Sequence, residues 1–183
     1  MGVSLLSPRL VAEAVALLSC TVAVITDLRT RRIPNSLTAS AALLAVVFHL
    51  TLGFYGHEWQ AALSGLTGGA ASLLLFSLLS LRGLVGFGDT KLIATLGLWL
   101  GAGSIAEISL YTLLAGGPLA IIHGFMTGQL RGAARNIADG KVLCAPSLDT
   151  EPEKLHPMPY ALAIACGTLW EVAGDHGIVP ALW

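Results

Sequence analysis

Long apolar segments separated by polar breaks dominate this chain of 183 residues and limit the folds open to it. A transmembrane helix needs roughly 17 to 25 mostly apolar residues to cross the hydrocarbon core of a bilayer. The polar breaks define six such segments, at residues 10–26, 36–55, 61–81, 90–104, 105–126 and 159–173. The fourth and sixth are short, so they require shielding by neighbouring helices or a locally thinner bilayer. The pattern predicts an all-α, polytopic membrane bundle of about six transmembrane helices, in one domain over residues 1–183.

Composition supports a membrane location and excludes several functions. Hydrophobic residues make up 55% of the chain and charged residues 11%, whereas a soluble domain carries roughly 25% charged residues. The formal net charge of −1 provides no basic surface for a phosphate backbone, so nucleic acid is not expected as a partner. The three cysteines form no CxxC pair, and we expect no structural zinc, no other metal and no cofactor.

The first apolar segment is interpreted as a retained helix rather than a cleaved signal peptide. A signal peptide ends in a small-residue cleavage site of the Ala-x-Ala type. Here the segment is followed by Asp27 and three arginines instead. This flank is typical of a transmembrane helix that ends at the membrane surface.

Basic residues are concentrated in alternate loops, which predicts the topology, since cytoplasmic loops collect Lys and Arg. Nine of the ten basic residues follow the first, third and fifth segments: Arg29, Arg31, Arg32, Arg82, Lys91, Arg131, Arg135, Lys141 and Lys154. Only Arg9 falls on the other side, together with Glu58, Glu107 and Asp175. These positions predict six spans in a lipid bilayer with both termini outside.

Two aspartates at the predicted cytoplasmic boundary are the candidate catalytic residues. Asp27 closes the first segment and Asp89 opens the fourth, so both carboxylates are expected at one depth. Inserting an Asp at the centre of a membrane helix costs about 2.5 to 3.5 kcal/mol of free energy even on mild insertion scales. Acidic residues next to a membrane span are therefore candidates for a functional role. Each also has an ordinary interpretation: Asp89 as a helix N-cap, and Asp27 as an ion-pair partner of the adjacent arginines.

The residues around the two acids suggest a shaped site. Gly86 and Gly88 precede Asp89 and remove side chains where a substrate backbone would approach, and they permit positive φ. After Asp27, Pro34 fixes the chain, and Asn35 or Ser36 is expected to cap the second helix. The helix dipole disfavours a negative charge at the C-terminal end of a helix and favours it at the N-terminal end. We therefore expect Asp27 to be the protonated acid and Asp89 the ionised base.

On these residues the chain resembles the prepilin peptidases, or type IV leader peptidases, which are GxGD aspartic membrane proteases. The family's Asp, basic stretch and Ile-Pro-Asn are matched by Asp27 through Asn35. Its Gly-x-Gly-Asp with a nearby Lys is matched by Gly86, Gly88, Asp89 and Lys91, and Pro159-Tyr160-Ala161 resembles a weaker third feature. The resemblance implies a dyad of Asp27 and Asp89, with Gly86, Gly88, Lys91, Pro34 and Asn35 binding substrate or shaping the site.

The resemblance further implies a pilin precursor as substrate and a multi-pass location in the bacterial inner (plasma) membrane, with the active site toward the cytoplasm. Many family members carry a cytoplasmic insertion with paired CxxC motifs and also N-methylate the trimmed pilin. This chain lacks that insertion and its cysteines. It resembles the short, peptidase-only form used for Flp or Tad-type pili, so no methyltransferase activity is expected.

Two alternatives remain open from the sequence. A transporter component would hold its acids near the midplane on broken helices, and a catalytically silent pilus-assembly subunit would keep the same fold. His49 and His123 are expected to be packed or interfacial residues rather than a competing site. The long polar segment 128–158 is interpreted as a solvated loop, with a leader-binding role for its acids Asp139, Asp149, Glu151 and Glu153 as the alternative.

Overall fold

The computed structural model describes residues 7–82, 85–126 and 160–179, and every regular element in these ranges is an α-helix. In chain order the helices are α1 (Pro8–Thr30), α2 (Asn35–Tyr55), α3 (Trp59–Leu81), α4 (Phe87–Leu100), α5 (Ala102–Met126) and α7 (Tyr160–Asp175). Four are long and apolar enough to cross a membrane, namely α1, α2, α3 and the Ala102–Ile122 part of α5. The predicted all-α, polytopic membrane fold is confirmed, and α4 and α7 are its two short helices.

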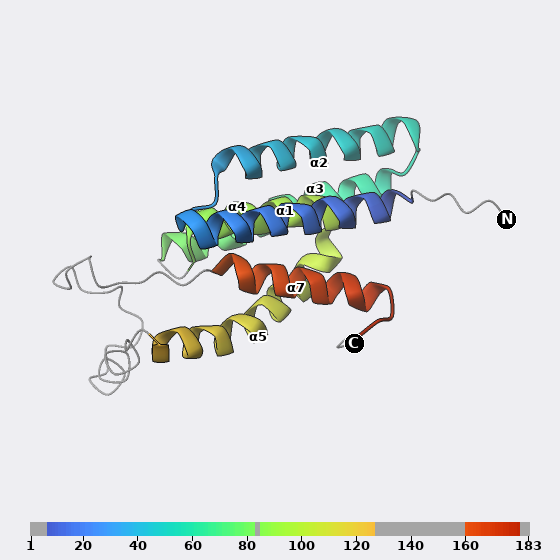
Figure 1. The fold of residues 1–183 in the computed structure, drawn as a ribbon. Helices are drawn as coiled ribbons and strands as arrows, with labels where there is room; N and C mark the ends of the chain where they lie inside the picture. The colour runs from blue at the N-terminus through green and yellow to red at the C-terminus, as the bar shows by residue number, and fades with distance from the viewer. Residues whose placement is uncertain (1–6, 83–84, 127–159, 180–183) are drawn as a thin grey trace.

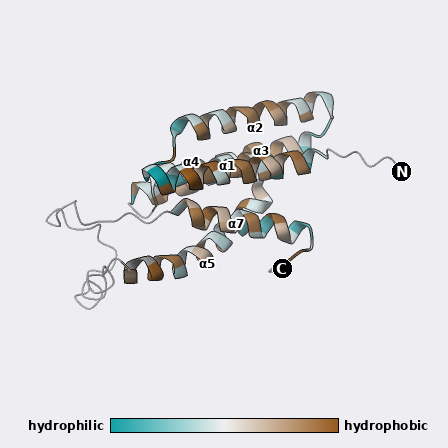
Figure 2. Cartoon of the chain, in the orientation of Figure 1, coloured by the Kyte–Doolittle hydropathy of each residue, from teal (hydrophilic) through white to brown (hydrophobic). Residues whose placement is uncertain are grey.

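The helices lie alongside one another and alternate in direction (Figure 1). At one end of the bundle α1, α3 and α5 finish and α2, α4 and α7 begin; we call this the aspartate end, and the opposite one the far end. Hydrophobic colour runs along the helices, and hydrophilic colour gathers toward their ends (Figure 2). This distribution matches an apolar slab bounded by two polar surfaces.

Several helix boundaries differ from the prediction by a few residues, and two of them show the physical reason. The first helix does not stop at Asp27 but continues to Thr30, and Arg31 ends it with a left-handed φ of 53°. Between α4 and α5 the break falls at Gly101, with φ 92°, and not at Ser104. Hydropathy located the apolar stretches, whereas backbone hydrogen bonds continue through charged residues until a residue leaves helical geometry.

Helix α4 lies at the centre of the bundle, since it contacts each of the other five described helices. Its approach to α3 depends on glycine. A Cβ added to Gly68 would lie 2.6 Å from the Gly97 carbonyl oxygen, and one added to Gly97 would lie 2.6 Å from the Gly68 carbonyl oxygen. Small residues at such a crossing let two backbones approach closely in a membrane, where no hydrophobic effect drives helices together.

A charged network fastens α1 to α7 at the far end. The Arg9 guanidinium donates to Glu13 at 2.8 Å and to Glu171 at 3.4 Å, and it also pairs with Asp175. Glu13 and Glu171 are each only 3% exposed, so Arg9 compensates two buried carboxylates. Arg9 and Asp175 were predicted on the same side of the membrane, and they meet here.

His49 is packed as predicted. It is 5% exposed, and its Nε2 lies 2.6 Å from the backbone carbonyl oxygen of Leu98 on α4. The predictions for the side chain of His123, for Pro159 and for the polar segment 128–158 lie outside the described residues.

The contact of α3 with α4 predicts unequal effects of two glycine substitutions. We expect Gly68→Ala to lower stability by about 1 to 3 kcal/mol, because the new methyl group collides with α4 backbone. Gly103→Ala, at a position with nothing within 4 Å, is the matched control and should leave stability unchanged or slightly raised. Thermal unfolding of both purified variants in detergent measures the difference, and equal melting temperatures would contradict this packing.

Candidate functional site

A cavity of about 570 Å³ opens at the aspartate end of the bundle. It is built from the end of α1, the link to α2, the first turn of α4 and the first residue of α7. Its lining residues are Asp27, Arg31, Arg32, Ile33, Pro34, Asn35, Gly86, Phe87, Gly88, Asp89, Lys91 and Tyr160. All seven residues predicted from the sequence to form the site line this one cavity.

Asp27 reaches the cavity from the last turn of α1. Its side chain is buried, with 9% of the residue exposed, and its backbone carbonyl accepts the Arg31 N–H at 2.8 Å. The left-handed conformation of Arg31 then turns the chain toward α2. Arg31 and Arg32 line the same cavity as Asp27, so positive charges border the space that its carboxylate faces.

Asp89 occupies the third position of α4, and Gly86 takes the N-cap position. The interpretation of Asp89 as the N-cap residue is therefore wrong, because Asp89 lies three residues after the N-cap. Its carboxylate instead reaches back and accepts the Gly86 backbone N–H, which is one half of a capping box. The charges of Asp89 and Asp27 also interact, so two acids 62 positions apart in the sequence act within one electrostatic environment.

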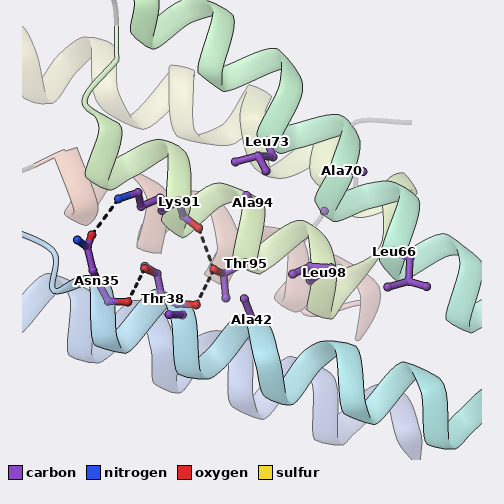
Figure 3. A pocket seen from close by; sticks show the side chains of 12 residues that line it. Asn35, Thr38, Ala42, Leu66, Ala70, Leu73, Lys91, Ala94, Thr95 and Leu98 are labelled. Carbon is purple, nitrogen blue, oxygen red and sulfur yellow. Dashed lines mark hydrogen bonds between the residues drawn. The ribbon is translucent and has the colours of Figure 1, made fainter.

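Lys91 and Asn35 join α4 to α2 beside the aspartates. The Lys91 Nζ donates to the Asn35 Oδ1 at 2.9 Å (Figure 3). Pro34 is the N-cap of α2, where no side chain caps the helix, so the predicted capping by Asn35 or Ser36 is wrong. The side-chain amide of Asn35 thus accepts a hydrogen bond from a residue on another helix, and local sequence does not reveal this partner.

The two glycines of the Gly-x-Gly-Asp motif differ in their surroundings. Gly86 has φ −69°, and within the described ranges positive φ among glycines occurs only at Gly101 and Gly177, so positive φ does not explain either motif glycine. A Cβ on Gly86 would lie 2.9 Å from the Asp89 Oδ2, whereas a Cβ on Gly88 would meet Ile33 at an ordinary 3.5 Å. Gly86 therefore leaves room for the Asp89 carboxylate.

Tyr160 and Phe87 line the cavity although the sequence did not single them out as site residues. Tyr160 begins α7, and its phenol interacts electrostatically with Asp89. Phe87 stands between the two motif glycines and is 59% exposed. An exposed aromatic ring flanked by glycines was the available signal for Phe87, and the Pro-Tyr opening of the last helix was the signal for Tyr160.

Comparisons with known proteins place this chain in a family. The model of the type IV leader peptidase family matches residues 14–121, a range that includes Asp27 and Asp89. A prepilin leader peptidase/N-methyltransferase of Neisseria gonorrhoeae is 35% identical over 107 residues, covering 56% of this chain and 37% of the relative. This chain thus matches little more than a third of that relative's length, and no solved structure matches it. With more than half of its residues matched by the family model, the chain belongs to the type IV leader peptidase family.

Proposed function

We propose that this protein is an aspartic endopeptidase that removes the short basic leader from type IV pilin-like precursors at the cytoplasmic face of the bacterial plasma membrane. One observation carries the proposal: Asp27 and Asp89, from helices distant in sequence, line the same open cavity at one end of a membrane bundle. Family membership supports the processing of prepilins, and the named gonococcal relative is a prepilin leader peptidase.

Two neighbouring carboxylates can hydrolyse a peptide bond without a covalent intermediate. Like charges at close range favour a state in which the pair holds one proton. The ionised carboxylate takes a proton from a water molecule while the oxygen of that water attacks the scissile carbonyl carbon. The protonated carboxyl group donates a hydrogen bond to the carbonyl oxygen. When the C–N bond breaks, the leaving amine takes up a proton from the pair. The pair titrates as a unit, so either Asp27 or Asp89 can serve as the base.

The position of the cavity fits the chemistry of such a precursor. Of the six Lys and Arg residues in the described ranges, only Arg9 lies at the far end. The other five lie at or next to the aspartate end, which supports a cytoplasmic orientation: Arg29, Arg31, Arg32, Arg82 and Lys91. A precursor with an apolar helix in the bilayer presents its leader at that surface. Transporters of known fold typically hold their ion-binding acids near the bilayer midplane, whereas Asp27 and Asp89 line a cavity at one end of the bundle.

The first test is cleavage of a co-expressed Flp-type prepilin in membranes. Asp27→Asn and Asp89→Asn each remove one proton-transferring group, so we expect each to slow cleavage by at least ~100-fold while the protein accumulates normally. Glu58→Gln, an exposed acid at the far end, is the matched control and should cleave like the native protein. Gel separation of precursor and product provides the rates.

Cleavage at the native rate by either aspartate variant would refute the dyad. If the native protein inserts normally but cuts none of a panel of prepilins, the alternative of a catalytically silent assembly subunit is favoured instead.

A second prediction separates the two motif glycines. Gly86→Ala pushes a methyl group against the Asp89 carboxylate, and a displacement of about 1 Å can cost roughly 100-fold in rate. Gly88→Ala meets only an ordinary contact with Ile33 and should retain most activity. Cleavage rates at equal protein levels make the comparison. A native rate for Gly86→Ala would contradict the role assigned to Gly86, and a selective loss with Gly88→Ala would instead indicate close substrate approach there.

A third prediction concerns the processed pilin. Because this chain lacks the paired CxxC insertion, we expect its product to keep an unmethylated amino terminus. Mass spectrometry of the product reads this directly, with the same precursor processed by the gonococcal peptidase/N-methyltransferase as the comparison. A methylated product from this protein, made in cells without another such enzyme, would overturn the expectation.

A further inference from the structure

A second cavity, of about 560 Å³, is an open groove on the side of the bundle between α2 and α3, with α4 as its floor. Each of the three helices contributes residues i, i+3, i+4 and i+7, beginning at Asn35 on α2, Leu66 on α3 and Lys91 on α4. Residues with this spacing lie on one face of a helix and extend over two turns, or about 10 Å. Figure 3 shows these faces turned toward one another along the groove.

The groove begins where the aspartate cavity ends. Asn35 and Lys91 line both cavities, and their hydrogen bond lies at the junction. From that junction the groove runs along α4 away from the aspartate end, as far as Leu98 (Figure 3). A chain lying in the aspartate cavity therefore has a continuous path into the apolar part of the bundle.

The surface of the groove suits an apolar helix. Alanines and Gly69 form much of its wall, and small residues allow close backbone approach between membrane helices. The two hydroxyl groups in it already donate within their own helices, from Thr38 Oγ1 to the Asn35 carbonyl at 3.2 Å and from Thr95 Oγ1 to the Lys91 carbonyl at 2.8 Å. These hydroxyls need no hydrogen bond from an occupant, so apolar side chains can cover them without cost.

We propose that this groove seats the apolar helix of the pilin-like precursor, with the leader and the scissile bond in the aspartate cavity. The inference rests on the proposed peptidase function and adds where the retained part of the substrate binds. The precursor helix lies in the bilayer and continues directly from the scissile bond. It must therefore descend along the bundle from the aspartate cavity, and the groove offers a path that shares Asn35 and Lys91 with that cavity.

The cleavage test uses two adjacent alanines of α3. Ala70 and Ala71 are both exposed, but only Ala70 lines the groove, so Ala71→Phe is the matched control for Ala70→Phe. Filling the groove should raise KM for the full precursor by at least about tenfold. We expect Ala71→Phe to leave that KM unchanged. The full precursor is assayed in membranes at equal enzyme levels.

Cross-linking tests the same contact without requiring activity. A photoreactive benzoyl-phenylalanine is placed at position 70 or at position 71 in the Asp27→Asn, Asp89→Asn double variant, and the Flp-type precursor is co-expressed. We expect an adduct from position 70 that mass spectrometry maps to the apolar helix of the precursor, and little or none from position 71.

The outcomes separate the two hypotheses. The docking proposal would be overturned if Ala70→Phe cleaved the precursor with an unaltered KM, or if positions 70 and 71 gave equal adducts. Neither result would contradict the peptidase activity. An adduct from position 70 with lipid alone would also overturn the docking proposal, because an acyl chain would then be the occupant. If the native protein cleaves nothing yet position 70 captures the precursor helix, the docking surface stands and the peptidase proposal fails.

Discussion

The backbone contact of α3 with α4 at Gly68 and Gly97 is the constraint on which the rest of the structure depends. Helix α4 has 14 residues, too few to cross a bilayer unaided, and it carries Asp89 on its first turn. Its depth in the membrane must therefore come from its neighbours. Because it contacts every other described helix, a shift of α4 would move Asp89 relative to Asp27 and change both cavities together.

Hydrogen bonds to α2 and α3 fix α4 further along its length. Trp99 Nε1 donates to the Ala41 carbonyl at 3.1 Å, and Thr90 pairs with Ser80 on α3 at 2.5 Å. The contact of His49 with the Leu98 carbonyl adds a third link. In a low-dielectric interior such bonds replace the water that a short helix would otherwise draw into the bilayer. A polar group that looks misplaced in an apolar sequence, such as His49, is here part of the packing of the central helix.

The sequence predicted the helical membrane fold and the common depth of Asp27 and Asp89, because hydropathy and charged boundaries are local properties. The residues flanking the two acids and the family resemblance completed the seven residues that converge on one cavity. The sequence placed the end of α1 too early, since apolar character stops at Asp27 while the helix continues to Thr30. It also misjudged Asn35, whose amide is bound by Lys91 from a helix more than 50 positions away. Partners of this kind depend on tertiary packing, so no local pattern predicts them.

The two ends of the bundle are built differently, and the difference bears on how the site is held. At the far end Arg9 binds acids on both α1 and α7, and buried positions then follow one face of α1 down to Asp27. Midway along that face, Cys20 donates to Thr168 of α7 at 3.7 Å. Fastening α1 and α7 at the far end and at mid-length sets their rotation about each other. Asp27 and Tyr160 therefore reach the cavity from helices whose relative rotation is set away from the aspartate end, so the position of both side chains depends on packing elsewhere in the bundle.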